Sequence, residues 1–351
     1  MKAVVLTRFG GEGVLEVLET PDPRPGRGEV LIQVRACGVN HVDLDVRAGI
    51  SRFPVKLPLI LGREISGDVV EVGSDVRSLR EGDRVAAGEM FTACWRCELC
   101  LNGRDNLCWS VDYPGLMRDG GYAELVALPE SYCVPLAPDL SHQVSAAGQI
   151  TFGTAWRALV HRSLGVFPGE TILITGAASG VGSAGIQVAG LLGLRVIAVV
   201  GSRLKVEAVK GLGAEEVIVY GEEDVADRVR DWTGGRGVDL VFDIVGGELF
   251  RESMKTLRYG GRLVLAGAHA GEVMPTDLIE VFRYERTILG TARATRGEMA
   301  LVMSMLAERR LSPVIDSIMP TSRAADAHRR LASRENVGKV ILVPDSELSL
   351  G

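Results

Sequence analysis

The segment that most constrains this chain runs from Ile172 to Ala189. Its first residues, Ile172 to Ile174, form a short apolar run typical of a buried parallel strand. A turn of small residues follows, and then the apolar spacing of a helix. This arrangement points backbone N–H groups and the positive end of the helix dipole at one place, which favours a bound phosphate. A second predicted strand, over 195–200, completes a βαβ unit.

The turn matches the dinucleotide-binding pattern G-x-G-x-x-G only in part, because its three positions hold Ala177, Ser179 and Gly182. A tight loop that binds nothing is the alternative, but the flanking strand and helix favour a dinucleotide site. Strands and helices keep alternating downstream, which predicts a doubly wound parallel sheet. Further strands are predicted at 216–219, 240–244, 262–266 and 287–289, and helices at 204–212, 225–233 and 249–257.

Length and charge exclude several classes of protein. At 351 residues the chain exceeds one ordinary domain, so two are expected. A net charge of −6 without a basic run argues against nucleic acid or an anionic membrane as a partner. Residues 1–7 predict a first strand and not a signal peptide, and no apolar run is long enough to span a bilayer. We therefore expect a cytoplasmic protein.

The residues before the dinucleotide segment predict a different kind of domain. Alternating apolar residues and glycine turns indicate strands such as 30–35 and 68–72, in a barrel-like β domain that resumes after residue 120. A helix over 145–162 is expected to lead into the dinucleotide segment. The tail predicts helices near 297–309 and 322–333 and a last strand over 339–343.

Four of the six cysteines crowd into residues 94–108 with the spacing C-x2-C-x2-C-x7-C. Four thiolates at this spacing suit a tetrahedral Zn²⁺ site, which would be structural because no coordination position stays open. Free or redox-active cysteines and an iron–sulfur cluster are the alternatives. The predicted ligands are Cys94, Cys97, Cys100 and Cys108, whereas Cys37 and Cys133 are expected to be core thiols.

These features resemble the medium-chain dehydrogenase/reductase superfamily, which includes zinc alcohol dehydrogenases and quinone oxidoreductases. The resemblance covers nearly the whole chain and includes Gly62-x-Glu64-x-x-Gly67 and the terminal Gly-Lys-Val-Ile-Leu. It implies a Rossmann doubly wound parallel sheet inserted after a GroES-like β-barrel domain, with the active site between the two. The implied divisions are a catalytic domain over 1–147 with a zinc lobe at 90–117, a Rossmann domain over 148–290, and a return to the catalytic domain over 291–351.

The departures from the family pattern concern its catalytic zinc. Family alcohol dehydrogenases hold that ion with a cysteine, a histidine, and a further cysteine or acid. The corresponding positions here hold Asn40, Arg63 and Ile150, none of which is a suitable Zn²⁺ ligand. Val42 occupies the position of the usual proton-relay hydroxyl. We therefore expect no alcohol oxidation by the metal mechanism.

Residues 38–49 instead match the quinone oxidoreductase pattern G-x-N-x-x-D-x-x-x-R-x-G. Hydride transfer in that branch needs oriented reactants and a group that stabilises the developing negative oxygen. The catalytic candidates are Asn40, as a hydrogen-bond donor, and Arg63, as a positive charge. A purely structural turn is the alternative role for Asn40. For Arg63 the alternative is a salt bridge to Glu64, Asp43 or Asp45.

The residues after the second strand of the βαβ unit bear on the choice of cofactor. NAD-dependent enzymes place an acid there for the ribose 2′-hydroxyl. This chain has Ser202, Arg203 and Lys205, which suit a 2′-phosphate. A solvated helix start is the alternative. The Gly-Ser-Arg triplet resembles that of NADP-dependent relatives, in which a tyrosine at the position of Tyr220 flanks the adenine.

The resemblance implies further contacts with the cofactor. His41 is expected at the pyrophosphate, Thr154 at the nicotinamide and Lys339 at the phosphates, with exposed surface positions as alternatives for His41 and Lys339. The cofactor-binding residues predicted in all are His41, Thr154, Ser179, Gly180, Val181, Gly182, Ser202, Arg203, Tyr220, Ala268 and Lys339. The remaining histidines divide into His269, a weaker candidate for the site, and three expected at the surface of helices, namely His142, His161 and His328.

The leading hypothesis is an NADPH-dependent oxidoreductase that transfers hydride to a quinone or an enone, with NADP(H) and one structural zinc as cofactors. The alternatives are a zinc-type alcohol or aldehyde dehydrogenase and a non-catalytic NADPH-binding protein. The expected partner is a small-molecule substrate. A homodimer or homotetramer is also expected, because family members pair the edge strand of the nucleotide sheet, here near 287–289.

Overall fold

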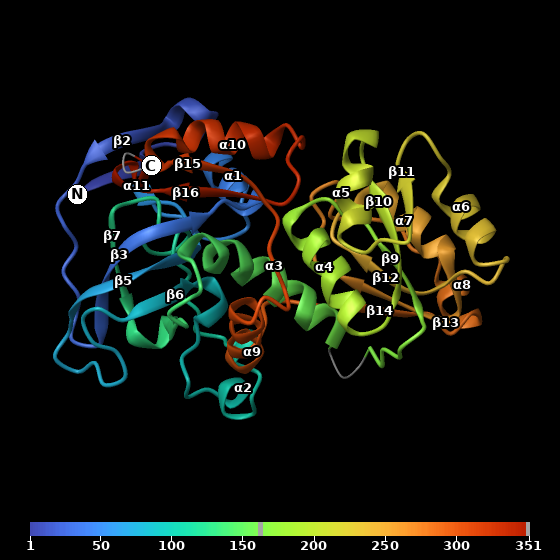
Figure 1. Ribbon diagram of the computed structural model, residues 1–351, viewed down its shortest axis with the longest axis horizontal. Helices are drawn as coiled ribbons and strands as arrows, with labels where there is room; N and C mark the ends of the chain where they lie inside the picture. The colour runs from blue at the N-terminus through green and yellow to red at the C-terminus, as the bar shows by residue number, and fades with distance from the viewer. Residues whose placement is uncertain (161–163, 349–351) are drawn as a thin grey trace. The chain divides into compact units, whose positions relative to one another are not determined.

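The computed structural model describes residues 1–160 and 164–348 (Figure 1). Cα packing divides the chain into two compact units. The first consists of Met1–Ile150 and Arg293–Gly351, and the second of Thr151–Ala292. These boundaries lie close to the expected divisions after residues 147 and 290.

The second unit is built on a six-stranded parallel sheet with the order β11-β10-β9-β12-β13-β14. Counted within the unit, this order is 3-2-1-4-5-6, the doubly wound arrangement that the sequence predicts. The strands are β9 (Thr171–Ile174), β10 (Arg195–Val200), β11 (Glu216–Val219), β12 (Val238–Asp243), β13 (Leu257–Leu265) and β14 (Thr287–Gly290). The helices are α4 (Gly180–Leu191), α5 (Val206–Gly211), α6 (Val225–Trp232), α7 (Gly247–Thr256) and α8 (Leu278–Arg283).

The first unit contains a seven-stranded sheet and a three-stranded sheet, β2-β1-β4. Six strands of the larger sheet have the order β15-β16-β3-β5-β6-β8, and the seventh, β7, pairs with β3. The core of the unit is formed by the apolar faces of these strands, such as Ile32, Ile65 and Leu342, all fully buried. The strands are β1 (Lys2–Leu6), β2 (Leu15–Glu19), β3 (Glu29–Gly38), β4 (Leu59–Ile60), β5 (Glu64–Val72), β6 (Arg84–Gly88), β7 (Leu125–Pro129), β8 (Cys133–Pro135), β15 (Ile315–Pro320) and β16 (Lys339–Val343).

The tail of the chain is part of this first sheet. Strand β16 lies antiparallel to β3, with Ile341 opposite Gly38 and Leu342 opposite Cys37 (Figure 1). The sheet therefore brings the start of β16 next to the end of β3, although about 300 residues separate them in sequence.

The helices of the first unit are short, apart from α3, which runs on into the second unit. They are α1 (His41–Ala48), α2 (Glu98–Leu101), α3 (His142–Val160), α9 (Arg296–Ala307), α10 (Ala324–Ala332) and α11 (Asp345–Leu348). Helix α3 corresponds to the helix expected over 145–162, whose last two residues lie outside the described residues. Within the part of the chain that the structure describes, no helix has the length and apolarity needed to cross a membrane.

Candidate functional site

The turn after β9 has a geometry that depends on two glycines. Gly176 has φ of +57°, in the left-handed region that favours glycine. A Cβ on Gly182 would lie 2.3 Å from the Gly176 carbonyl oxygen, so only glycine allows this approach of helix and turn. Ser179 caps α4 by accepting a hydrogen bond from the Gly182 N–H (3.1 Å). Gly176, one residue before the first fingerprint position at Ala177, therefore makes the turn.

Four further cofactor-binding candidates in the second unit follow strands of its parallel sheet, at the edge where these strands end. Ser202 and Arg203 follow β10, Tyr220 follows β11, and Ala268 follows β13. Arg203 forms an ion pair with Glu222, and its side chain is 80% exposed. These positions agree with the rule that ligands bind at the carboxyl ends of parallel strands. Their contacts with a cofactor stay predictions, as do those of Gly180 and Val181 in the first turn of α4, Thr154 in α3 and His41 in α1.

Asp243, at the end of β12, is a buried residue that the sequence analysis missed. Its Oδ1 atom accepts hydrogen bonds from the Thr175 hydroxyl (2.6 Å) and the Val245 N–H (2.9 Å). The Thr175 hydroxyl oxygen in turn accepts from the Ile244 N–H (3.1 Å). Asp243 therefore ties the turn after β9 to the turn after β12, at the point where the strand order reverses. An acid at the end of an apolar strand is the signal that marks it.

The four clustered cysteines converge in the structure. Their Sγ atoms all lie within 4.8 Å of one another. Three of the Sγ–Sγ distances are 3.5, 3.9 and 3.9 Å. A tetrahedron with Zn–S bonds of about 2.3 Å has edges of about 3.8 Å, so these side chains fit a Zn²⁺ ion. Among the described residues they form the one group of three or more potential ligands that converges in this way.

The cysteine segment is held in place by two arginines from the tail. Arg293 is buried and donates to the carbonyls of Thr92 (2.8 Å) and Asn106 (2.9 Å). Arg296 donates through its backbone N–H to Asp105 (2.8 Å) and through its guanidinium to the carbonyls of Ser131 and Cys133. The two remaining cysteines, Cys37 and Cys133, are buried core thiols as expected, and burial raises the pKa of Cys133 to about 12.

Asn40 lies in a buried polar cluster with Glu64 and Lys339. The Asn40 Nδ2 atom donates to Glu64 Oε2 (2.9 Å), and the Ile150 N–H donates to Glu64 Oε1 (2.6 Å). The Lys339 ammonium donates to Glu64 Oε2 (2.5 Å), Asn40 Oδ1 (2.8 Å) and the Val39 carbonyl (2.8 Å). Glu64 is fully buried and Lys339 is 6% exposed. The buried Glu64 carboxylate, next in sequence to Arg63, thus has the Lys339 ammonium as its counter-ion.

This cluster changes the interpretation of Lys339. The alternative of an exposed surface charge is wrong, because the side chain is buried. Its three N–H groups are all bonded inside the first unit, so this arrangement leaves no donor for the predicted phosphate contact.

Arg63 forms the expected kind of salt bridge with a different partner. Its guanidinium lies 2.6 Å from a carboxylate oxygen of Glu89, and not on Glu64, Asp43 or Asp45. The guanidinium carbon also lies 5.4 Å from the ring centroid of Tyr113 and 5.8 Å from that of Phe53. Arg63 is 4% exposed. Sequence reasoning missed Glu89 because this residue directly follows β6, and only the pairing of β5 with β6 brings it next to Arg63, directly before β5.

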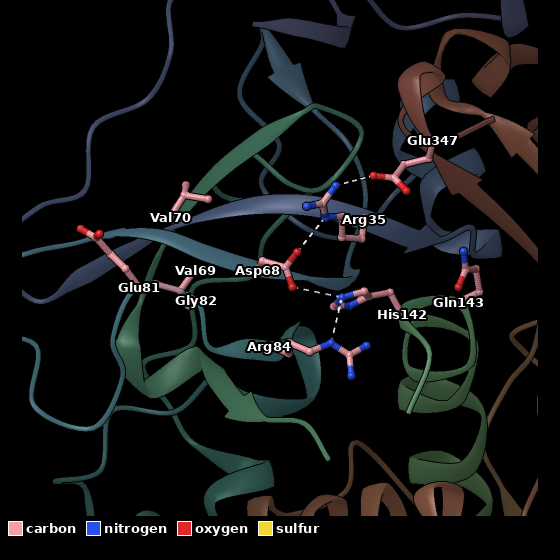
Figure 2. A pocket seen from close by; sticks show the side chains of 10 residues that line it. All are labelled: Arg35, Asp68, Val69, Val70, Glu81, Gly82, Arg84, His142, Gln143 and Glu347. Atoms are coloured by element: carbon pink, nitrogen blue, oxygen red, sulfur yellow. Dashed lines mark hydrogen bonds and ion pairs between the residues drawn. The ribbon is translucent and has the colours of Figure 1, made fainter. Parts of the chain in front are cut away.

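A hollow of about 680 Å³ lies elsewhere on the first unit. Figure 2 shows Arg35 between Asp68 and Glu347, and His142 between Asp68 and Arg84. Each of these charged groups already has a partner of opposite charge or a hydrogen bond within the unit. We therefore interpret the charged residues that line this hollow as structural ion pairs, which attach the C-terminal helix α11 to β3.

Of the three histidines expected at the surface, His142 is half-buried, His328 is buried, and His161 lies outside the described residues. His142 contacts Ser66 Oγ (2.8 Å) through Nδ1 and Asp68 Oδ1 (3.2 Å) through Nε2. The contacts Ser66–His142–Asp68 resemble a hydrolase triad. Ser66 is fully buried, however, so no substrate reaches its hydroxyl. Burial lowers the pKa of His142. His328 is also fully buried.

Comparison with known proteins identifies relatives along the whole chain. The family described as "Alcohol dehydrogenase GroES-like domain" matches residues 26–139, and "Zinc-binding dehydrogenase" matches residues 180–308. An alcohol dehydrogenase of Geobacillus stearothermophilus is 32% identical, over 98% of this chain and 100% of that protein. A quinone oxidoreductase of Rattus norvegicus is 30% identical over 98% of each chain.

Two further matches bear on the chemistry. An acryloyl-coenzyme A reductase of Metallosphaera sedula is 31% identical, over 97% of this chain and 99% of that protein. A solved structure described as an NAD-dependent alcohol dehydrogenase is 40% identical, with a TM-score of 0.92 over 98% of this chain and 99% of that one.

Proposed function

This chain belongs to the medium-chain dehydrogenase/reductase superfamily of oxidoreductases, and from that membership we propose that it is an NADPH-dependent reductase of quinones or enones that works without a catalytic metal. NADPH, held by residues that include Ser202 and Arg203, would supply a hydride to the enone β-carbon or to the quinone, and negative charge would then develop on the substrate oxygen. A proton from solvent completes the reduction. The protein has to orient the reactants and stabilise that charge.

The buried cluster of Asn40, Glu64 and Lys339 is the observation that supports this proposal. Glu64 is bonded to an ammonium and an amide, so it is already neutralised without an ion. One Asn40 N–H bonds to Glu64 at 2.9 Å, whereas the other makes only a 3.4 Å contact with the Gly38 carbonyl. In our proposal the substrate oxygen replaces that longer contact, and the ammonium adds positive charge behind it.

The names of the relatives support a reduction but also suggest a second candidate. The quinone oxidoreductase and the acryloyl-coenzyme A reductase are named for the two substrate types of our proposal. The similarity to a structure described as an NAD-dependent alcohol dehydrogenase favours the second candidate, an alcohol or aldehyde dehydrogenase. We propose one structural zinc at the four cysteines for either activity.

A substrate screen together with metal analysis tests the proposal. Quinones, enones and enoyl thioesters are supplied with NADPH, and alcohols and aldehydes with each of the oxidised and reduced cofactors. We expect NADPH oxidation with a quinone or an activated C=C compound and about one zinc per chain. Turnover of alcohols alone, with about two zinc ions per chain, would establish the dehydrogenase instead. Tight NADPH binding without any turnover would indicate a non-catalytic binding protein.

The preference for NADPH over NADH is predicted to depend on Arg203. Replacing Arg203 by alanine should weaken NADPH binding about tenfold or more, because a charge-assisted hydrogen bond to the 2′-phosphate is lost. NADH binding should stay within about twofold, as measured by the quenching of protein fluorescence. Arg195→Ala is the matched control, since Arg195 also forms an exposed ion pair, with Glu215, but lies at the opposite end of β10. A wild-type protein that prefers NADH would contradict this prediction.

We further propose that the protein acts in the cytoplasm as a homodimer or homotetramer. Strand β14 supports the oligomer, because it is the edge strand of the parallel sheet and Ile288 on it is partly exposed.

A further inference from the structure

A chain of buried polar side chains in the first unit runs from the Asn40 loop to helix α10. The Asn40 N–H donates to Asp43 Oδ2 (2.8 Å), which also accepts from the Tyr122 hydroxyl (3.2 Å). The Tyr122 oxygen lies 3.2 Å from His328 Nε2, and His328 Nδ1 lies 3.3 Å from Arg47 Nη1. Asp43, Tyr122 and His328 are fully buried, and Arg47 is 7% exposed. These residues come from α1, the segment before β7, and α10.

The donors and acceptors give this chain of hydrogen bonds a single direction. A guanidinium only donates, so Nδ1 of His328 accepts from Arg47. Burial lowers the pKa of His328 to about 3, so its ring is neutral and its proton lies on Nε2. That N–H donates to the Tyr122 oxygen, and the Tyr122 hydroxyl donates to Asp43. Each polar group in the chain therefore determines the orientation of the next one.

This hydrogen-bond chain is suited to fixing the positions of its residues and not to conducting a proton. It ends at Arg47, whose guanidinium stays protonated and forms an ion pair with Glu12 at 3.0 Å. Tyr122 also packs against the segment that carries Glu64. A Cβ on Gly62 would lie 2.6 Å from the Tyr122 ring, and Gly62 has φ of +103°, where only glycine is unstrained. Tyr122 thus contacts both chain segments that meet at Asn40 and Glu64.

We propose that Tyr122 and His328 are positioning residues of the active site, which hold Asp43 and through it the backbone of Asn40. The proposal rests on the function proposed above, since it assigns Asn40 to the reacting oxygen. A residue that acts in this way changes the rate of hydride transfer more than the binding of the cofactor, because a small displacement of a hydrogen-bond donor weakens its contact with the transition state.

The test uses variants that either break the hydrogen-bond chain or keep its donor-to-acceptor direction. Tyr122→Phe removes the hydroxyl, and His328→Leu removes both ring nitrogens. His328→Gln keeps the chain, because the amide oxygen accepts from Arg47 and the amide nitrogen donates to Tyr122. Tyr132→Phe is the control, since Tyr132 is a buried tyrosine of the same unit. The measurements are kcat and KM with NADPH and the best substrate of the screen, melting temperature, and deuterium exchange of the peptide over residues 38–48.

We expect Tyr122→Phe and His328→Leu to lower kcat about tenfold or more with the KM for NADPH nearly unchanged. His328→Gln should restore kcat to within about threefold of wild type, and Tyr132→Phe should match wild type. Equal losses of kcat in His328→Gln and His328→Leu would overturn the proposal. A full kcat in Tyr122→Phe, or a loss that only follows the melting temperature, would overturn it as well.

Deuterium exchange separates a failure of this inference from a failure of the proposed function. Exchange over residues 38–48 should become faster in Tyr122→Phe and His328→Leu, and stay as in wild type in His328→Gln and Tyr132→Phe. If the wild-type protein reduces no quinone or enone but this exchange pattern appears, the proposed function fails and the positioning of Asn40 stands. Unchanged exchange in all variants would overturn the positioning role itself.

Discussion

Replacing Lys339 by methionine is expected to lower the free energy of unfolding by about 3–5 kcal/mol, because it leaves the buried Glu64 carboxylate without its counter-ion. Lys339 and Glu64 are 6% and 0% exposed, so water does not compensate for the lost ammonium. The measurement is a urea titration followed by circular dichroism. Lys210→Met is the matched control, since Lys210 forms an exposed ion pair with Glu207 and should contribute less than about 1 kcal/mol.

The double variant Lys339→Met/Glu64→Gln separates the stability of this pair from its effect on the reaction. It removes both charges, so most of the lost stability should return. We expect it to fold and still to oxidise NADPH slowly, because no positive charge remains beside Asn40. A loss in Lys339→Met no larger than that of the Lys210 control would show that the ion pair is not buried as described.

Acid is expected to unfold the protein in a narrow pH range, because three buried groups act with different signs. His328 has a folded pKa of about 3 against an ordinary 6.5, caused by its burial and by Arg47. The unfolded chain therefore binds this proton first, and stability falls as the pH falls from 6.5 to 3. At about 1.4 kcal/mol per pH unit the total is about 5 kcal/mol.

Asp43 and Asp239 modify this loss in opposite directions. Burial raises the pKa of Asp43 from 3.8 to about 6, so the folded protein binds this proton first and gains stability as the pH falls from 6 to 4. The pKa of Asp239 is about 2: burial alone would raise it, but its bonds to Arg236, the Thr171 N–H and Arg258 outweigh that effect. Its stabilising contribution is lost as the pH falls from 3.8 to 2. The three groups together should thus change the stability little between pH 6 and 4 and lower it steeply below 4.

Melting curves of two variants at pH 7, 5 and 3.5 check these signs. Asp43→Asn removes the group that offsets His328, so its melting temperature should already fall between pH 6.5 and 4. His328→Gln removes the largest acid-sensitive group, so its melting temperature should hold or rise over the same range. If Asp43→Asn follows the wild-type curve, the carboxyl of Asp43 does not titrate in this range and the assignment is wrong.

Local patterns in the sequence were sufficient for most of the architecture. The strands and helices of the second unit follow the predicted ranges, since apolar runs and small-residue turns specify βαβ units through nearby residues. The cysteine spacing predicted the convergence of four thiols for the same reason, because the ligands lie within residues 94–108. The sequence pattern did not predict that Gly176, just before the incomplete glycine fingerprint, adopts the positive φ that makes the turn.

The sequence by itself determined two domains, a dinucleotide-type sheet and the spacing of the cysteine site, and its family resemblance implied that Asn40, Arg63 and Ile150 replace the metal ligands. Only the tertiary structure decided which charges meet there. Lys339 reaches Asn40 because β16 pairs with β3 in one register, and Arg63 meets Glu89 because β5 pairs with β6. His328 is buried because α10 packs against α1. The physical reason is that contacts between residues distant in sequence depend on strand register and helix packing, which the local spacing of residues does not encode.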